Sequence, residues 1–390
     1  MRYVAINKLE ETAMNALGIS PEKDPFPISS PLTVDYWADN KDLQKRIIQA
    51  QLDSILFASN ALYVFWGPLG VGKTFAAHYL ANPKAKQLIE ESVKKSVEPL
   101  IFRVVAAAPA RTGQLIYPLF RDIVEKCFSV ILKDEKLTQV LTKSYDQIEN
   151  GKIKNAFRDI QKRMIKTFAG RLNIEAINQS EGYKLLVTDK SKLGKIQDIN
   201  ELISVIQFLV QVLLHRFTRV IIVIDELENL AKATRAETFL VSDLLRKMHD
   251  EIDHGLTLIL IFTFDSFEEV QQMLQKSLVD RIRDKIEFDF VENVSDITEY
   301  INDCIKMRTG TNPDDIIAPD VVKEIAETLN TKFKKRLSFR DINKEMHRIF
   351  SETFIHAGQP SKYKLDLELY QSSISSITPD EVIQQLKNAE

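Results

Sequence analysis

A short glycine-rich segment limits the folds that are open to this chain. Only 12 of the 390 residues are glycine, yet three of them fall within six positions of the segment Gly67–Thr74. The apolar run Leu62–Trp66 leads directly into this segment, which reads GPLGVGKT. This is the pattern G-x-x-x-x-G-K-[ST] in the setting that it requires, a strand followed by a loop and then a helix. The sequence therefore predicts an α/β fold in which this loop holds phosphate groups.

The residue types of this loop explain the expected chemistry. Glycines let consecutive backbone N–H groups turn inward around an anion, and a helix that begins at Lys73 points its positive dipole end at the same place. Lys73 is expected to reach the β- and γ-phosphates, and the Thr74 hydroxyl to bind Mg²⁺. The residues predicted to contact the nucleotide belong to the loop and the start of its helix: Gly67, Pro68, Gly70, Val71, Gly72, Lys73, Thr74 and Phe75.

Short apolar runs alternate with longer helical segments through the first three quarters of the chain. Runs of five to seven residues rich in Val, Ile and Phe are typical of strands that are buried on both faces of a parallel sheet. The expected strands are Leu62–Trp66, Leu100–Ala106, Val220–Ile224, Leu258–Thr263 and Ile286–Phe290. This alternation predicts a five-stranded parallel sheet flanked by helices.

The strand signals stop after Val291, and three helical segments follow. They are Asp296–Met307, Pro319–Leu329 and Phe339–Phe354, and they predict a small all-α domain.

We therefore expect four parts in the chain. They are a lead-in over 1–40, a nucleotide-binding core over 41–291, a helical lid over 292–357 and a tail over 358–390.

The core contains a long insertion between the second and third strands, at about 135–198. Residues 143–195 carry twelve basic and six acidic side chains, a net charge of +6, whereas the whole chain has a net charge of −3. This insertion is a candidate basic surface. The alternative is a solvated helical excursion that packs only against itself.

Two adjacent carboxylates follow the third strand. Asp225 and Glu226 come directly after five branched apolar residues, and acids at a buried strand end are costly unless a cation lies nearby. With a phosphate loop upstream, Asp225 is expected to hold Mg²⁺ through water, and Glu226 to act as the base that polarises the attacking water. Glu228, two positions further, is expected to face solvent.

Further polar residues are candidates at the sheet edges and in the lid. Thr263 ends the fourth strand and is expected to bond the γ-phosphate or the attacking water, unless it only satisfies the strand end or the register favours Asp265. Arg281 or Arg283, before the fifth strand, is expected to reach the nucleotide of a neighbouring subunit, the alternative being exposed helix-end arginines. Arg340 lies in the first turn of a helix that the capping box Ser338–Asp341 opens, and it is expected to sense nucleotide from the lid.

Together these motifs resemble the AAA+ ATPases over residues 41–355, and within them the initiator-type group of Orc/Cdc6-like origin proteins, TnsC-type transposition regulators and related mobile-element or defence proteins. The resemblance implies that Lys73 and Thr74 form the Walker A pair and that Asp225 and Glu226 form the Walker B pair. It also implies sensor 1 at Thr263, an arginine finger at Arg281 or Arg283, and sensor 2 at Arg340. The expected cofactors are ATP and Mg²⁺, and the expected activity is ATP hydrolysis. The 36 residues after Phe354 are too few for the winged-helix domain of Orc/Cdc6 proteins, so DNA reading by such a domain is not expected.

Composition excludes several other classes. The chain has 52 basic and 55 acidic side chains, so its surface as a whole is not a polycation. Its two cysteines lie far apart, which rules out a disulfide framework. The N-terminus has no secretory signal, and the longest apolar runs fall short of the ~20 residues that cross a bilayer. We expect a cytoplasmic protein without a membrane partner.

Two hypotheses of function remain open beside a weaker one. The first is an ATP-switched ATPase that self-associates through its arginines and contacts double-stranded DNA. The second is a signalling or assembly switch that acts on a protein partner without binding DNA. A metabolic kinase is the weaker third, because such enzymes seldom carry a helical lid after five strands.

Overall fold

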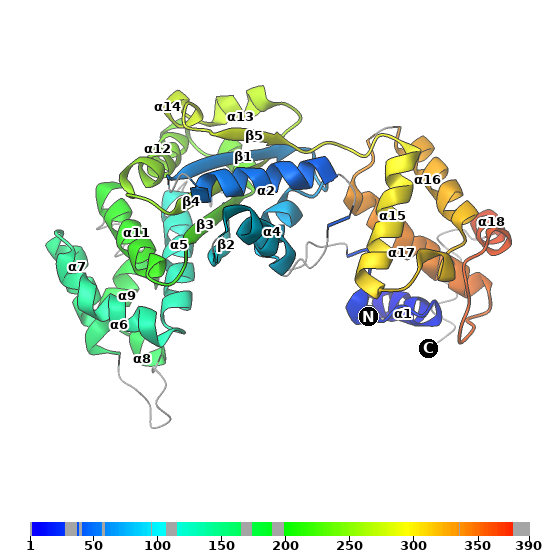
Figure 1. Cartoon of the computed structure of the whole chain (residues 1–390), viewed down its shortest axis with the longest axis horizontal. Helices are drawn as coiled ribbons and strands as arrows, with labels where there is room; N and C mark the ends of the chain where they lie inside the picture. Colours follow the sequence, from blue (N-terminus) through cyan, green and yellow to red (C-terminus); the bar gives the residue numbers. More distant parts are fainter. Residues whose placement is uncertain are drawn as a thin grey trace. The chain divides into compact units, whose positions relative to one another are not determined.

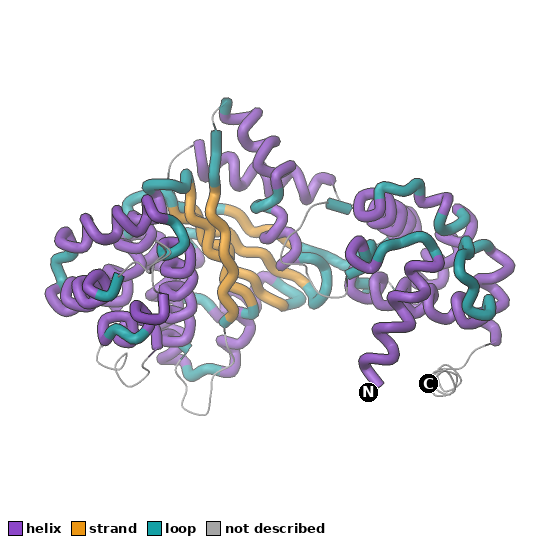
Figure 2. Tube along the Cα trace, turned by 90° about the horizontal axis from the view of Figure 1, so that it is seen from below, coloured by secondary structure: helices purple, strands orange, loops and turns teal. Residues whose placement is uncertain are grey.

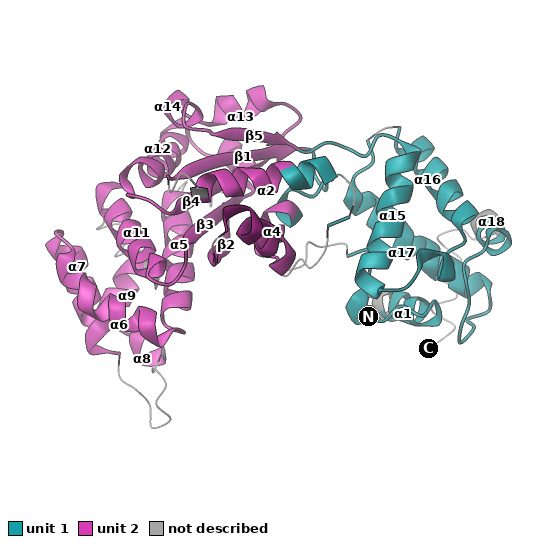
Figure 3. Cartoon of the chain, viewed as in Figure 1, with its two compact units in different colours: residues 1–45, 68–75, 288–390 teal, residues 46–67, 76–287 magenta. Residues whose placement is uncertain are grey.

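The computed structural model describes residues 2–27, 37–38, 41–56, 59–94, 96–106, 115–164, 174–188, 199–334 and 336–376. The chain divides into two compact units, coloured separately in Figure 3. Unit 1 comprises residues 1–45, 68–75 and 288–390, and unit 2 comprises residues 46–67 and 76–287.

Unit 2 is built on the five-stranded parallel sheet that the sequence predicts. The strand order is β2-β3-β4-β1-β5, and every pair is parallel. The strands lie side by side between helical layers (Figure 2). Their bounds are β1 Ala61–Gly67, β2 Pro99–Val105, β3 Arg219–Asp225, β4 Leu256–Thr263 and β5 Asp284–Glu287. The last strand starts two residues earlier than expected.

Helices cover both faces of this sheet, as the apolar sequence of its strands requires. One face packs with α5, α11 and α12 in a continuous core, whereas Tyr63 on the other face donates a hydrogen bond of 2.5 Å to Ala50 O on α2 (Figure 1). The helices are α2 Lys41–Leu56, α3 Lys73–Tyr79, α4 Pro83–Val93, α5 Ile116–Ile131, α11 Ile199–Leu214, α12 Arg235–Glu251, α13 Phe267–Met273 and α14 Lys276–Val279. Of these, α2 begins in unit 1, and α3 begins in unit 1 and ends in unit 2.

The insertion between β2 and β3 is a helical module that shares the core of unit 2. Its helices are α6 Glu135–Ser144, α7 Gly151–Lys162, α8 Ile174–Asn178 and α9 Glu181–Tyr183, the last continuing into the π-helical turn η3 Lys184–Thr188. The Phe157 ring of α7 lies 6.0 Å from that of Phe128 on α5 and 4.7 Å from that of Phe208 on α11. The alternative in which the insertion packs only against itself is therefore wrong. Residues 165–173 and 189–198 of this module lie outside the described part of the chain.

Unit 1 has a second apolar core, which is formed by helices from both ends of the chain. These are α1 Arg2–Ala16, α15 Val294–Thr309, α16 Pro319–Phe333, α17 Phe339–His356 and α18 Leu367–Ser376. Apolar residues of α1 and of the following turn, among them Met14, Leu17 and Phe26, pack with α17 in this core. The expected all-α domain is present, and it includes the N-terminal segment that the sequence presents as a lead-in.

No helix in the described part of the chain has both the length and the apolar character needed to span a membrane.

Candidate nucleotide-binding site

The glycine-rich loop joins β1 to α3, as the sequence order of strand, loop and helix predicts. Gly67, Gly70 and Gly72 have φ values of 141°, 85° and 95°, a region that glycine enters without a steric penalty. The Lys73 ammonium is buried, with 6% of the residue exposed, and donates a hydrogen bond of 2.5 Å to Pro68 O. The loop is therefore curled around the amine of its own lysine. This is the arrangement expected of an anion-binding loop.

The first turn of α17 contacts this loop within unit 1. The Arg340 backbone N–H donates to Gly70 O at 3.3 Å. A Cβ atom at Gly70 would lie 2.8 Å from Ser338 Oγ and 3.0 Å from Arg340 Cβ, so the approach depends on glycine. The expected capping box is present, since Asp341 N donates to Ser338 Oγ at 3.2 Å and Asp341 Oδ2 accepts from Ser338 N. The lid residue predicted to sense nucleotide is thus adjacent to the phosphate loop.

The two carboxylates after β3 lie at the carboxyl edge of the sheet in unit 2. Asp225 ends β3 and is 5% exposed, and its Oδ1 accepts a hydrogen bond of 2.8 Å from Glu226 N. Glu226 adopts φ 60°, which is unusual for a residue with a side chain, and this side chain is 50% exposed. The backbone therefore turns sharply so that one carboxylate is buried while the next points outward.

Sequence reasoning missed Arg103, which pairs with Asp225. Arg103 lies on β2, and its Nε and Nη2 atoms are both 2.9 Å from Asp225 Oδ2. His78 on α3 interacts electrostatically with both Arg103 and Asp225. Burial lowers the pKa of His78, the positive charge of Arg103 lowers it further, and Asp225 opposes the shift. The signal in the sequence is an arginine inside the apolar run Leu100–Ala106, where a charge is unexpected.

The expectation that Glu228 faces solvent is wrong. Glu228 is half-buried, and its Oε2 accepts a hydrogen bond of 3.2 Å from the backbone N–H of Thr263. Thr263 ends β4 and pairs with Gly67 at the end of β1. The register therefore places Thr263, and not Asp265, at the strand end next to the start of the phosphate loop. Glu228 is missed because a side chain two positions after a strand can turn back only when the tertiary structure offers it a donor.

The two candidate finger arginines have different surroundings at the opposite, amino edge of the sheet. Arg281 Nε lies 2.7 Å from both carboxylate oxygens of Asp250. Arg283 is exposed, and its backbone N–H donates to Leu62 O near the start of β1. Asp250 therefore holds Arg281 against α12, whereas Arg283 is presented at the surface of unit 2.

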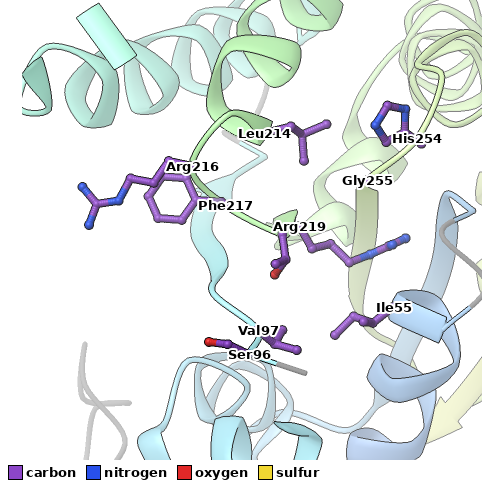
Figure 4. A pocket seen from close by; sticks show the side chains of 10 residues that line it. Ile55, Ser96, Val97, Leu214, Arg216, Phe217, Arg219, His254 and Gly255 are labelled. Carbon is purple, nitrogen blue, oxygen red and sulfur yellow. The ribbon is translucent and has the colours of Figure 1, made fainter. Parts of the chain in front are cut away.

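A cavity of about 310 Å³ also lies at this amino edge (Figure 4). Its wall includes Arg219, which is 1% exposed and donates to Ser54 O, Leu256 O and Thr257 Oγ1. Burial lowers the pKa of Arg219 to about 10. These contacts tie the end of α2 to the start of β4. Because the cavity lies at the amino edge of the sheet, it is separate from the carboxylates at the carboxyl edge.

The residues at the carboxyl edge fit a divalent cation. Asp225 offers carboxylate oxygen, a donor that Mg²⁺ prefers. The ion pair with Arg103 further shows that the buried Asp225 carboxylate takes a cation as its partner.

Comparison with known proteins identifies the fold. No family model matches the chain, and no curated protein matches it in sequence. Among solved structures, the Aeropyrum pernix ORC2 protein with ADPNP and ADP matches with a TM-score of 0.51 and 12% identity, covering 90% of this chain and 73% of that one. The ADP form of the same protein matches with a TM-score of 0.51 and 12% identity, covering 90% of this chain and 72% of that one. The Aeropyrum pernix ORC1 protein in complex with DNA matches with a TM-score of 0.42 and 15% identity. The match covers 88% of this chain, which spans 66% of the length of the ORC1 chain.

Proposed function

The chain shares the fold of the Orc-type AAA+ proteins that its motifs resemble, and we propose that it is an ATPase that binds ATP with Mg²⁺ and uses hydrolysis as a conformational switch. The observation that carries the proposal is the phosphate loop, whose three glycines have φ values between 85° and 141° and which encloses the buried Lys73. The carboxylate pair at the end of β3 supplies the second half of the site.

Each residue has a distinct role in this proposal. The loop N–H groups and Lys73 hold the β- and γ-phosphates, and Arg340 adds a positive charge from the lid. Mg²⁺, held by Thr74 and through water by Asp225, supplies charge neutralisation at the phosphate oxygens. Glu226 accepts a proton from water as the water oxygen bonds to the γ-phosphorus, and the bond to the β–γ bridging oxygen breaks to leave ADP. Thr263 orients this water or the γ-phosphate.

We propose double-stranded DNA as the partner of the ATP-bound state. The support is the charge of the insertion, where Arg158, Lys162 and Arg163 are exposed on and beside α7 and have no ion pair among the described residues. Such a surface suits contact with a phosphate backbone, and binding of this kind weakens steeply as salt rises.

A protein partner is the second candidate, and a specific observation favours it. Phe239 and Leu240 on α12 are 56% and 42% exposed, so two neighbouring apolar side chains meet solvent. Exposed apolar side chains of this size are common at protein contacts.

The nucleotide site is tested first, with two variants and a fluorescent ATP analogue. Lys73→Ala should abolish binding, because the loop loses the charge that it encloses. Glu226→Gln should bind as the wild type does but hydrolyse ATP about 10²- to 10⁴-fold more slowly, because it loses its base. Unchanged affinity in Lys73→Ala would overturn the loop assignment, and normal turnover in Glu226→Gln would place the base elsewhere.

The partner is tested with the Glu226→Gln protein loaded with ATP. It is titrated onto a short labelled duplex at low and moderate salt, with the ADP-loaded protein as the control. Salt-sensitive binding that requires ATP supports the DNA proposal. If no binding occurs at either salt concentration, the protein partner becomes the better hypothesis.

A further inference from the structure

We propose that Arg103 acts as an internal counter-ion of the metal site and that Mg²⁺ must compete with its guanidinium for Asp225. This inference rests on the proposed function, in which Asp225 holds Mg²⁺. Arg103 would then be a positioning residue that sets the Mg²⁺ concentration at which nucleotide binds tightly.

Both oxygens of Asp225 have partners within the chain. Oδ1 accepts from Glu226 N at 2.8 Å, and Oδ2 lies 2.9 Å from two nitrogens of Arg103. Arg103 Nη2 is also 3.9 Å from Glu226 Oε1. A metal-bound water that donates to Oδ2 must share this oxygen with the two Arg103 nitrogens or displace them.

Burial makes this contact important. The Asp225 side chain is 7% exposed, and a carboxylate so far from water is costly without a partner charge. Arg103 supplies this charge, and a guanidinium–carboxylate contact of this kind is stronger than one between neutral groups. A divalent cation entering the site gains the attraction of Asp225 only to the extent that it replaces the guanidinium.

The strand register keeps Arg103 in this position. Arg103 pairs with Val223 on β3, two residues before Asp225. Its neighbours Phe102 and Val104 are buried in the core on the other face of the sheet, so the alternation of β2 fixes the face on which Arg103 lies. The side chain is therefore anchored on a rigid strand beside β3.

The test measures nucleotide binding against free Mg²⁺ for Arg103→Gln and Arg103→Lys. The readout is the anisotropy of a fluorescent ATP analogue, from EDTA to saturating Mg²⁺. In Arg103→Gln, the Mg²⁺ concentration for half-maximal binding should fall by about tenfold, equivalent to about 1.4 kcal/mol. Affinity in EDTA should also fall, because the carboxylates that lose the guanidinium repel the triphosphate. Arg103→Lys, which keeps the charge, should restore most of the wild-type dependence.

Arg121 provides a matched control. Its side chain is 31% exposed, against 32% for Arg103, and it pairs with Asp122 at 3.1 Å on α5 in the same unit. Arg121→Gln should leave the Mg²⁺ dependence unchanged. In an Asp225→Asn background, Arg103→Gln should produce no further shift, since the shared carboxylate has lost its charge.

The outcomes separate this inference from the proposed function. If Arg103→Gln and Arg103→Lys both keep the wild-type Mg²⁺ midpoint and the wild-type affinity in EDTA, the ion pair is only structural and the inference is overturned. If Arg103→Gln fails to fold, the double variant Arg103→Gln,Asp225→Asn is compared with Asp225→Asn alone. A difference between their Mg²⁺ midpoints overturns the inference as well. If the wild-type protein binds no nucleotide at any Mg²⁺ concentration, the proposed function itself is overturned.

Discussion

His347 holds the N-terminal segment onto the helical unit through charge. It is 6% exposed on α17, its Nε2 lies 3.2 Å from Asp24 Oδ2 and 3.0 Å from Phe26 O, and its Nδ1 lies 3.7 Å from Glu10 Oε2. Burial opposes protonation of the imidazole. The hydrogen bond to Asp24 and the charges of Asp24 and Glu10 outweigh burial, so the pKa of His347 is raised above its ordinary value of 6.5. His347 thus links α1 and the following turn to α17.

We expect the docking of this segment to weaken as the pH rises above about 6.5. A folded-state pKa above the unfolded one gives stability that is fully present below pH 6.5 and is lost as the pH rises through the folded value. The measurement is hydrogen exchange of the α1 amides, corrected for intrinsic rates. His347→Gln should remove this pH dependence, whereas a variant of the exposed His215, His215→Gln, should retain it.

Glu10 requires its own variant in that experiment. Burial raises the pKa of Glu10, so its contribution is also lost with rising pH, starting from a lower value. If Glu10→Gln rather than His347→Gln removes the change above pH 6.5, the carboxylate and not the imidazole is the titrating group.

At the scale of elements, the insertion depends on the close crossing of α7 and α9. A Cβ atom at Gly182 would lie 2.0 Å from Ala156 O, and the Gly182 N–H donates to Asp159 Oδ2 at 2.9 Å. The backbone of α9 therefore approaches α7 more closely than any residue with a side chain permits. This contact fixes the position of α7 in unit 2, and with it the exposed Arg158 and Lys162.

Gly182→Ala should destabilise the protein by about 2–3 kcal/mol, since the added methyl group meets backbone atoms that cannot move aside. Gly151→Ala, at the start of α7, is the control. A Cβ atom there meets nothing within 4 Å, so stability should be unchanged or raised by up to about 1 kcal/mol. Both are measured by urea unfolding. Equal stabilities for the two variants would show that α7 and α9 separate at little cost.

At the scale of the whole molecule, unit 2 carries candidate site residues at two opposite edges of its sheet. The carboxylates and Thr263 lie where β3 and β4 end, whereas the candidate finger arginines precede β5 at the amino edge. Residues at opposite ends of parallel strands cannot serve the same nucleotide. If an arginine at the amino edge acts on nucleotide, we expect that nucleotide to be bound by another copy of the chain.

Hydrolysis per subunit should therefore rise with protein concentration. Arg283→Ala should abolish this rise, because an arginine that reaches a neighbour's phosphates contributes about 10³-fold or more in rate. Arg281→Ala should reduce it less, since Asp250 already engages that side chain. Turnover measured across a hundredfold range of concentration tests both. A larger loss in Arg281→Ala would reverse the assignment, and a constant rate in the wild type would exclude hydrolysis across subunits.

Much of the fold and of the loop follows from local sequence. The apolar runs identify all five strands, and the spacing of the glycines identifies the loop between β1 and α3. The capping box Ser338–Asp341 marks the start of α17. These features rest on interactions between residues close in the chain, such as a glycine with positive φ or a side chain that caps its own helix.

The partners of the charged side chains follow only from tertiary structure. The sequence by itself determined the parallel sheet, the glycine-rich loop and the carboxylates after β3, because hydrophobic periodicity and backbone geometry are local properties. Tertiary structure alone decided that Arg103 meets Asp225, that Glu228 turns back to Thr263, and that the insertion joins the main core. Each of these contacts joins residues more than thirty positions apart or on different elements, and strand order and register set which of them meet.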